Sequence, residues 1–194
     1  IGSDSRIGSK FLDSGPGFGG SCFKKDILNL VYLSKYFGLP EVAKFWESVV
    51  NLNNWNQSRI SKLVVKKLFG TISGKNLCIL GFAFKANTND TRESAAIKIC
   101  KDLIDEGAIL HIHDPKVDID QIEIDLCMKP INKEFVSNES NNKNREGGWY
   151  FSKSIYEACD GTDAVIVLTE WEIYSEIDWL KVARKMRSPS WVFD

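Results

Sequence analysis

The sequence lacks the features that would place a protein at once in a nucleic-acid-binding, membrane or secreted class. Its 194 residues carry a formal net charge of -1, so no excess of basic residues favours nucleic acid or an anionic membrane as a partner. No apolar run approaches the length of a membrane span, and no signal peptide is visible. With 43% hydrophobic and 26% charged residues, the composition is typical of a soluble globular protein.

Histidine is scarce, and cysteine occurs without the spacing of a metal or redox motif. His111 and His113 are the only histidines and have no cysteines at ligand spacing beside them, so we predict no metal site. Cys78 lies in a strand pattern and Cys100 in a helical pattern, which is typical of buried core residues. An odd number of cysteines without a CxxC pair favours a reducing, cytoplasmic location over a disulfide framework. The five are Cys22, Cys78, Cys100, Cys127 and Cys159.

Glycine and proline cluster in one stretch, residues 15–20, shortly before Cys22. Apolar residues then recur at three- and four-residue spacings from Phe23 to Val31, which predicts that Cys22 lies where a tight loop enters a helix. Glycines let backbone N–H groups approach a ligand closely, and a helix N-terminus favours negative charge. These features favour a reactive thiolate at Cys22.

Three charged residues follow this cysteine. Lys24 and Lys25 would stabilise a thiolate, and Asp26, one helical turn on, offers a base near the thiol. The arrangement makes Cys22 a candidate nucleophile. The alternative is a buried structural cysteine, with the two lysines on a solvated helix face.

A second helix is predicted from Pro40 to Phe69, after Gly38 has ended the first one in the left-handed conformation. Its apolar stripe contains no breaker, and a single helix of this length would span roughly 45 Å. That is more than a small domain needs, so we predict contact between subunits or between domains. The alternative is two helices with a break near residues 51–54.

Strand and helix patterns alternate from residue 76 onward, which predicts a parallel sheet covered by helices on both faces. A linker is expected at 70–75 and a mobile polar loop at 129–148. We expect strands at 77–80, 109–113, 122–126, 164–168 and 191–193, and helices at 93–106, 152–159 and 174–186.

The loop after the first of these strands, residues 81–85, lies where open α/β sheets bind ligands. It lacks the GxGxxG pattern and so is not a dinucleotide fingerprint. Lys85 and Arg92 could contact phosphates, and Phe82 or Phe84 could pack on a base or a sugar. A solvated basic loop with one core phenylalanine is the alternative.

Six blocks of sequence occur in order along the chain. They are Gly-Phe-Gly-Gly-Ser-Cys-Phe-Lys-Lys-Asp at 17–26, Leu-Pro-Glu-Val-Ala at 39–43, Gly-Phe-Ala-Phe-Lys at 81–85, Asp-Thr-Arg-Glu-Ser at 90–94, His-Asp-Pro-Lys at 113–116 and Thr-Glu-Trp at 169–171. Together they closely resemble the UDP-glucose 6-dehydrogenases of the UDP-glucose/GDP-mannose dehydrogenase family. The resemblance runs through nearly the whole chain and matches the central and C-terminal parts of that family. The family's N-terminal NAD-binding domain has no counterpart here.

The resemblance implies an enzyme that oxidises the C6 alcohol of UDP-glucose to a carboxylate with two NAD. The cysteine matching Cys22 would hold the aldehyde as a thiohemiacetal and then as a thioester, and the aspartate matching Asp26 would help to activate water. A four-electron oxidation needs a nucleophile that retains the aldehyde, and a thiolate does this well. Cys22 itself, Lys25 and Arg92 would lie on the cofactor side.

The resemblance implies that the glycine-rich stretch and the 81–85 loop form the sugar-nucleotide site, together with Arg6 from a neighbouring subunit. This chain has Asp13 where the family has a basic residue, so any contact from Asp13 is expected through its backbone. The implied substrate-binding set is Arg6, Phe11, Asp13, Ser14, Gly15, Pro16, Gly17, Phe18, Gly19, Phe84 and Lys85.

The implied fold is a helical dimerisation segment with one long helix, residues 1–72, followed by a Rossmann-like α/β domain for the UDP-sugar, residues 73–194. We expect a homodimer through the long helix, and a higher oligomer is the alternative. The chain begins at Ile1 rather than Met and ends at Asp194 after an apolar run, so we expect a piece of a longer protein, inactive alone. The alternatives are a dehydrogenase of another nucleotide sugar, such as GDP-mannose or a UDP-N-acetylated sugar, or a module that only binds and dimerises.

Overall fold

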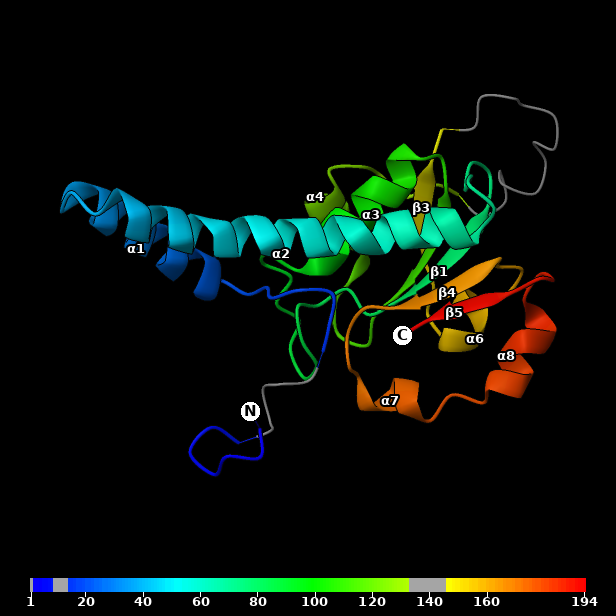
Figure 1. The fold of residues 1–194 in the computed structure, drawn as a ribbon. Helices are drawn as coiled ribbons and strands as arrows, with labels where there is room; N and C mark the ends of the chain where they lie inside the picture. The colour runs from blue at the N-terminus through cyan, green and yellow to red at the C-terminus, as the bar shows by residue number, and fades with distance from the viewer. Residues whose placement is uncertain (1, 9–13, 133–145) are drawn as a thin grey trace.

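The computed structural model describes residues 2–8, 14–132 and 146–194, and shows a helical hairpin joined to an α/β sheet domain (Figure 1). Helices α1 (Phe23–Tyr36) and α2 (Pro40–Lys67) form the hairpin and pack against each other. Gly38 lies between them with a φ angle of 71°, and Pro40 begins the second helix. Both predicted features of this turn are confirmed.

Helix α2 is one continuous helix of 28 residues, so the alternative of a break near residues 51–54 is wrong. Ala43 and Val50 are buried in its first half. Val64 and Leu68, at its far end, belong to the hydrophobic core of the sheet domain. Helix α2 therefore runs from the hairpin across the sheet and connects the two parts (Figure 1).

Five parallel strands form one sheet in the order β3-β2-β1-β4-β5, which is the order of a doubly wound sheet. Helices α2, α3 and α4 cover one face, and α6, α7 and α8 cover the other (Figure 1). The predicted parallel sheet with helices on both faces is confirmed. The strands are β1 (Asn76–Leu80), β2 (Ile109–His113), β3 (Gly148–Phe151), β4 (Ala164–Val167) and β5 (Trp191–Phe193). The helices are α3 (Ala95–Asp105), α4 (Ile119–Leu126), α6 (Ile155–Ala158), α7 (Glu172–Ser175) and α8 (Trp179–Lys185).

The strand predicted at 122–126 is wrong, because this segment is the second half of helix α4. Asp118 caps that helix by accepting a hydrogen bond from the backbone N–H of Gln121 at 2.8 Å. Ile122 and Leu126, four residues apart, are its buried positions. The helical spacing of the buried residues and the capping aspartate therefore explain why this segment is a helix rather than a strand.

Two further elements differ from the prediction. The single helix expected at 174–186 is two helices, α7 and α8, because Asp178 caps a new helix start by accepting from the N–H of Lys181. Strand β3, which was not predicted, pairs with β2 at the edge of the sheet. Most of the polar stretch before it, residues 133–145, lies outside the described residues.

The core of the sheet domain contains the two cysteines that the patterns predicted there. Cys78 and Cys100 are both 0% exposed, and burial raises the pKa of both thiols. Their placement as core residues is confirmed. Within the described parts of the chain, no helix combines the length and apolar content needed to cross a membrane.

Candidate active site around the Cys22 loop

The carboxyl ends of three neighbouring strands define one edge of the sheet. Leu80 at the end of β1 pairs with His113 at the end of β2 and with Val167 at the end of β4. The loops that follow therefore leave the sheet at the same level. Strand order reverses between β1 and β4, and ligands of doubly wound sheets bind at this point.

A single buried carboxylate, that of Asp114, holds two of these loops. Its Oδ2 accepts hydrogen bonds from the backbone N–H groups of Phe82 at 2.7 Å and Ala83 at 3.1 Å, and from the indole of Trp171 at 3.3 Å. Its Oδ1 accepts from the two backbone N–H groups that follow Pro115. Three of the blocks that carry the family resemblance are thus joined in one network.

The third loop crosses the first at a point where only glycine fits. Gly81 has a φ angle of 92°, and an added Cβ would lie 2.5 Å from the side chain of Thr169. The hydroxyl of Thr169 donates to the carbonyl of Ala83 at 2.7 Å, and Glu170 accepts from the N–H of Ala86 at 3.2 Å. The 81–85 loop is therefore fixed from both neighbouring strands.

The glycine-rich loop before Cys22 lies directly on the loop between β1 and α3. The N–H of Gly20 donates to the carbonyl of Arg92 at 2.8 Å. An added Cβ at Gly19 would lie 2.5 Å from the carbonyl oxygen of Glu93, and one at Gly20 would lie 3.0 Å from the ring of Phe84. The structure thus brings together the two loops that the sequence singled out separately.

Helix α2 holds the other side of the glycine-rich loop. The Oδ1 of Asn53 accepts from the N–H of Phe18 at 2.9 Å, and its Nδ2 donates to the Phe18 carbonyl at 3.1 Å. Asn56 donates to the carbonyl of Pro16 at 3.1 Å. Sequence analysis missed both residues. One signal was available, since Asn53 follows Val50 by three residues on the buried face, and a buried amide usually has specific partners.

Cys22 stands at the N-cap position of α1 as an exposed, free thiol, and its side chain makes no capping hydrogen bond. Its Sγ lies 3.6 Å from the Oγ of Ser21. The pKa of Arg92 is raised, chiefly by its hydrogen bond to Asp90 and in smaller part by the charge of Cys22. The backbone of Arg92 lies near Cys22 as well, since its carbonyl accepts from the N–H of Gly20, two residues before the cysteine.

The three charged residues after Cys22 have different surroundings. Lys24 forms an ion pair with Glu93 at 2.7 Å, so its charge is already paired and links α1 to the β1–α3 loop. Glu93 has a φ angle of 55°, an uncommon backbone conformation for a residue other than glycine. Lys25 and Asp26 are exposed. Both are therefore accessible from solvent beside the thiol.

The 81–85 loop has one buried and one half-buried phenylalanine. Phe82 is 0% exposed and belongs to the core, whereas Phe84 faces the glycine-rich loop. The Nζ of Lys85 lies 5.3 Å from the centre of the Phe84 ring. Phe84 and Lys85 are therefore the members of this loop that border the site.

The remaining predicted site residues lie near the N-terminus. Arg6 is exposed and pairs with Asp4 at 2.7 Å within its own turn. Phe11 and Asp13 lie outside the described residues. Among the histidines, cysteines and carboxylates that the structure describes, no group of three or more could hold a metal ion.

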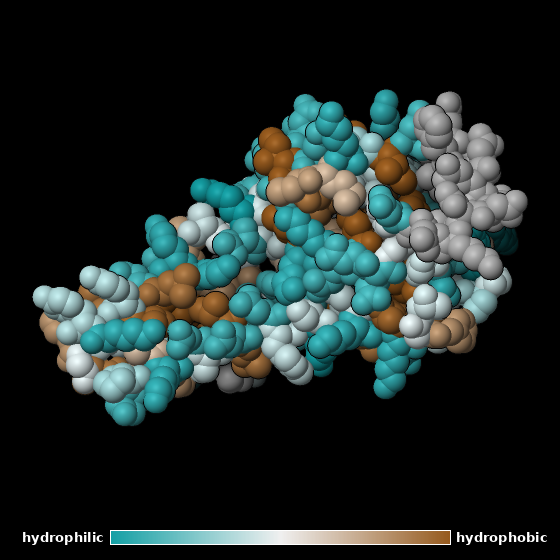
Figure 2. Space-filling view, turned by 90° about the horizontal axis from the view of Figure 1, so that it is seen from above, coloured by the Kyte–Doolittle hydropathy of each residue, from teal (hydrophilic) through white to brown (hydrophobic). Residues whose placement is uncertain are grey.

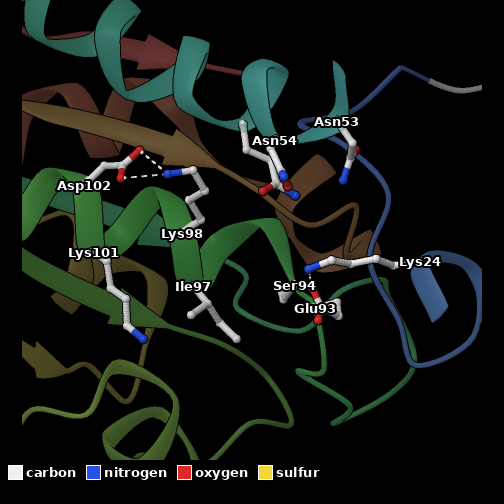
Figure 3. A pocket seen from close by; sticks show the side chains of 10 residues that line it. Lys24, Asn53, Asn54, Glu93, Ser94, Ile97, Lys98, Lys101 and Asp102 are labelled. Carbon is white, nitrogen blue, oxygen red and sulfur yellow. Dashed lines mark hydrogen bonds and ion pairs between the residues drawn. The ribbon is translucent and has the colours of Figure 1, made fainter. Parts of the chain in front are cut away.

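A cavity of about 470 Å³ opens beside the glycine-rich loop, between α2, α3 and the start of α1 (Figure 3). Its lining is polar, with two ion pairs, Lys24 to Glu93 at 2.7 Å and Lys98 to Asp102 at 3.1 Å. Figure 3 shows Asn53 descending from α2 beside the trace of the loop. Asn53, which binds the glycine-rich loop, thus also lines the cavity.

Fold and site together define a Rossmann-like α/β domain with a helical arm that carries an exposed cysteine beside the β1–α3 loop. The chain belongs to the UDP-glucose/GDP-mannose dehydrogenase family. Residues 78–194 match the family's UDP binding domain, and residues 1–55 match its central domain. The family resemblance predicted from the sequence blocks is confirmed.

The relatives are longer than this chain. Proteins named UDP-glucose 6-dehydrogenase from Bos taurus and Drosophila melanogaster are 46% and 44% identical to it over 199 and 194 residues. Both alignments cover 100% of this chain but 38% and 39% of those relatives. The chain thus spans about two fifths of their length.

Solved structures share the arrangement. A UDP-glucose dehydrogenase from the archaeon Pyrobaculum islandicum matches with a TM-score of 0.72 at 26% identity, over 100% of this chain and 41% of that one. A GDP-mannose dehydrogenase from Pseudomonas aeruginosa matches with a TM-score of 0.65 at 20% identity, over 96% of this chain and 38% of that one. The second likeness concerns the fold alone.

Proposed function

We propose that this chain is the substrate-side part of an NAD-dependent UDP-glucose 6-dehydrogenase, which acts as the full-length protein. The observation that carries the proposal is the exposed thiol of Cys22 at the start of α1, on a loop held against the β1–α3 loop. Relatives with 44–47% identity that bear this enzyme's name support the choice of UDP-glucose.

Oxidation of an alcohol to an acid removes four electrons as two hydrides, for which bound NAD supplies the acceptor. After the first hydride has left C6, the Sγ of Cys22 attacks the aldehyde carbon while the carbonyl oxygen takes up a proton. The product is a thiohemiacetal, which keeps the aldehyde on the protein. The attacking form is the thiolate, which is the nucleophilic form of a cysteine.

The second hydride leaves the same carbon and converts the thiohemiacetal into a thioester. Water then adds to the thioester carbonyl, the carbon–sulfur bond breaks, and UDP-glucuronate departs as the thiol is restored. Asp26, exposed one turn after Cys22, accepts the proton of the attacking water. Cys22 and Asp26 are therefore the proposed catalytic residues.

The substrate would lie over the glycine-rich loop and the end of β1. In that place the segment 14–19 offers backbone groups, Phe84 an aromatic face and Lys85 a cation for phosphate. Phe11 and Asp13 complete the proposed set, together with Arg6 from a neighbouring subunit. The exposure of Arg6 in its own chain is compatible with that role.

The cations beside the thiol fit a dinucleotide. Arg92 and Lys25 are exposed, and the carbonyl of Arg92 accepts from the N–H of Gly20, two residues before Cys22. Guanidinium and ammonium groups suit a pyrophosphate. Cys22, Lys25 and Arg92 would therefore contact NAD on the α1 side of the site.

Self-association through the long helix is the second part of the proposal. Figure 2 shows hydrophobic side chains gathered on the arm formed by α1 and α2. Large apolar residues that stay exposed there are Phe23, Leu28, Leu30, Tyr32, Leu33, Tyr36, Val42, Phe45, Leu52 and Trp55. So many exposed apolar side chains favour a second copy as partner, and a homodimer or larger assembly follows.

Two finer assignments belong to the same proposal. Residues 1–72 would form the central dimerisation domain and residues 73–194 the UDP-sugar domain. A cytoplasmic location is favoured by the five free thiols.

An assay of NAD reduction by the full-length protein tests the proposal. The panel would be UDP-glucose, GDP-mannose and a UDP-N-acetylated sugar. We expect UDP-glucose to be oxidised with the highest kcat/KM. Preference for either other sugar would move the assignment to another nucleotide-sugar dehydrogenase, and no NAD reduction with any of them would favour a binding module.

A further inference from the structure

We propose that Asn53 is a positioning residue for Cys22, which it serves by holding the backbone of Phe18 from helix α2. The inference concerns the site of the proposed dehydrogenase and rests on that function. The inference goes beyond the proposed function because it gives α2 a direct part in positioning Cys22.

An amide is the side chain that can make both bonds seen here. The N–H of Phe18 needs an acceptor and its carbonyl needs a donor, and Asn53 supplies one of each at 2.9 and 3.1 Å. Its side chain is only 8% exposed, so water competes little for these bonds. An aspartate in its place would keep the acceptor and lose the donor.

The loop is shaped for this contact. Gly17 has a φ angle of 143°, and an added Cβ would lie 2.6 Å from the Oδ1 of Asn53. On the opposite side, Gly19 meets the backbone of Glu93 equally closely. The glycine-rich loop is therefore held between α2 and the β1–α3 loop, and Phe18 is the residue that Asn53 binds.

Displacement of Phe18 would be passed on to the reactive residue. Its ring packs edge-to-face on the ring of Phe23 with centroids 4.6 Å apart, and Phe23 is the first residue of α1. Cys22 directly precedes Phe23. A shift at Phe18 therefore moves the start of α1, where Cys22 lies.

The test uses the full-length protein with Asn53→Ala, which loses both bonds, and Asn53→Asp, which loses one. Asn51→Ala is the matched control, because Asn51 is an exposed asparagine on the same helix. Two quantities are measured for each variant. One is the alkylation rate of Cys22 by iodoacetamide relative to the exposed Cys127, and the other is kcat and KM for UDP-glucose. Thermal unfolding and circular dichroism report the fold.

We expect kcat to fall by about tenfold in Asn53→Asp and by up to about a hundredfold in Asn53→Ala, as for a misplaced reacting group. Alkylation of Cys22 should change by a smaller factor, about twofold to fivefold, because a freely diffusing reagent responds only to the surroundings of the thiol. The KM for UDP-glucose should change less than kcat. The Asn51→Ala protein should match the wild type. Alkylation still decides the role of Asn53 if the wild type oxidises none of the nucleotide sugars, so the two proposals can fail separately.

Two results would overturn the inference. One is that both Asn53 variants fold and match Asn51→Ala in alkylation and kcat. The other is that both fail to fold while Asn51→Ala folds, since Asn53 would then serve the fold rather than the position of the thiol. If only Asn53→Ala fails to fold, the alkylation rate and kcat of Asn53→Asp decide whether Asn53 positions Cys22.

Discussion

At the scale of single residues, Asp114 stabilises the ligand-binding edge of the sheet through five hydrogen bonds to one carboxylate that is 4% exposed. Asp114→Ala leaves buried N–H donors without a partner. We expect the free energy of unfolding to fall by about 3 kcal/mol. Urea denaturation of the variant and the wild type measures this loss.

Asp118→Ala is the matched control for that measurement. Asp118 lies four residues on and caps α4 with one hydrogen bond. Its loss should cost only about 1 kcal/mol. Equal losses for Asp114→Ala and Asp118→Ala would show that the network at Asp114 adds nothing beyond an ordinary cap.

His113 gives the protein a predictable response to acid. Its Nδ1 donates to the hydroxyl of Tyr174 at 3.1 Å, and that hydroxyl donates to the His113 carbonyl at 3.0 Å. Burial lowers the pKa of His113 below its usual 6.5, against the opposing charges of Asp114 and Glu157. The folded state thus binds this proton less readily than the unfolded state does.

Stability contributed by neutral His113 is therefore present above about pH 6.5 and is lost as the pH falls toward the folded pKa. His113→Phe keeps a ring against Tyr174 and removes the titration. The difference in free energy of unfolding, wild type minus variant, should decrease between about pH 7.5 and about pH 5.5. Denaturant titrations at both pH values measure it, and a constant or rising difference would contradict the assigned shift.

Sequence reasoning found Cys22 but missed Asn53 and gave Asp114 no role beyond the 113–116 block, and the physical reason is distance along the chain. The setting of Cys22 is local, because the glycines and the helix start are its immediate neighbours. Asn53 binds a residue 35 positions away, and Asp114 one 32 positions away. Such partners become neighbours only through the packing of α2 on the loop and the pairing of β1 with β2.

At the scale of elements, the long strongly patterned segments were the ones predicted correctly. Helix α2 and strand β2 have clear spacing and clear ends, and both occur as expected. The errors fall on the short segments 122–126 and 148–151 and on 174–186, where two short helices, α7 and α8, replace the one expected. The four residues of β3 form an edge strand that is defined by pairing with β2 rather than by their own pattern.

The arm formed by α1 and α2 carries the next prediction. Phe45 and Leu52 are 61% and 63% exposed and lie seven residues apart, hence on one face of α2. The double change Phe45→Lys with Leu52→Lys puts charge into the proposed subunit contact. We expect the dissociation constant of the oligomer to rise by about a hundredfold or more, as for hot-spot residues. Sedimentation velocity over a concentration series measures it.

Asn51→Lys places the same charge at an exposed polar position of the same helix. This control should leave the assembly intact. Unchanged association in the double variant, or equal weakening in the control, would place the subunit contact elsewhere.

At the scale of the whole molecule, the candidate site lies where the arm meets the sheet. Helix α2 contributes to the hairpin, to the sheet core and to the hydrogen bonds that hold the glycine-rich loop. The family resemblance predicts that the Cys22 and 81–85 blocks serve one site, and in the structure Gly19 and Gly20 contact the β1–α3 loop. A change in the arm would thus reach Cys22, the proposed nucleophile, through one helix.

The most direct test of the central claim is the turnover of Cys22→Ser in the full-length protein. A hydroxyl ionises far less readily than a thiol, so thioester chemistry is lost while the binding surface stays. We predict that UDP-glucuronate production falls by about a thousandfold or more, with the dissociation constant for UDP-glucose nearly unchanged, as expected for a group that acts in the chemical steps. Near-normal production of UDP-glucuronate by Cys22→Ser would contradict the account and leave Cys22 as a structural residue of the loop.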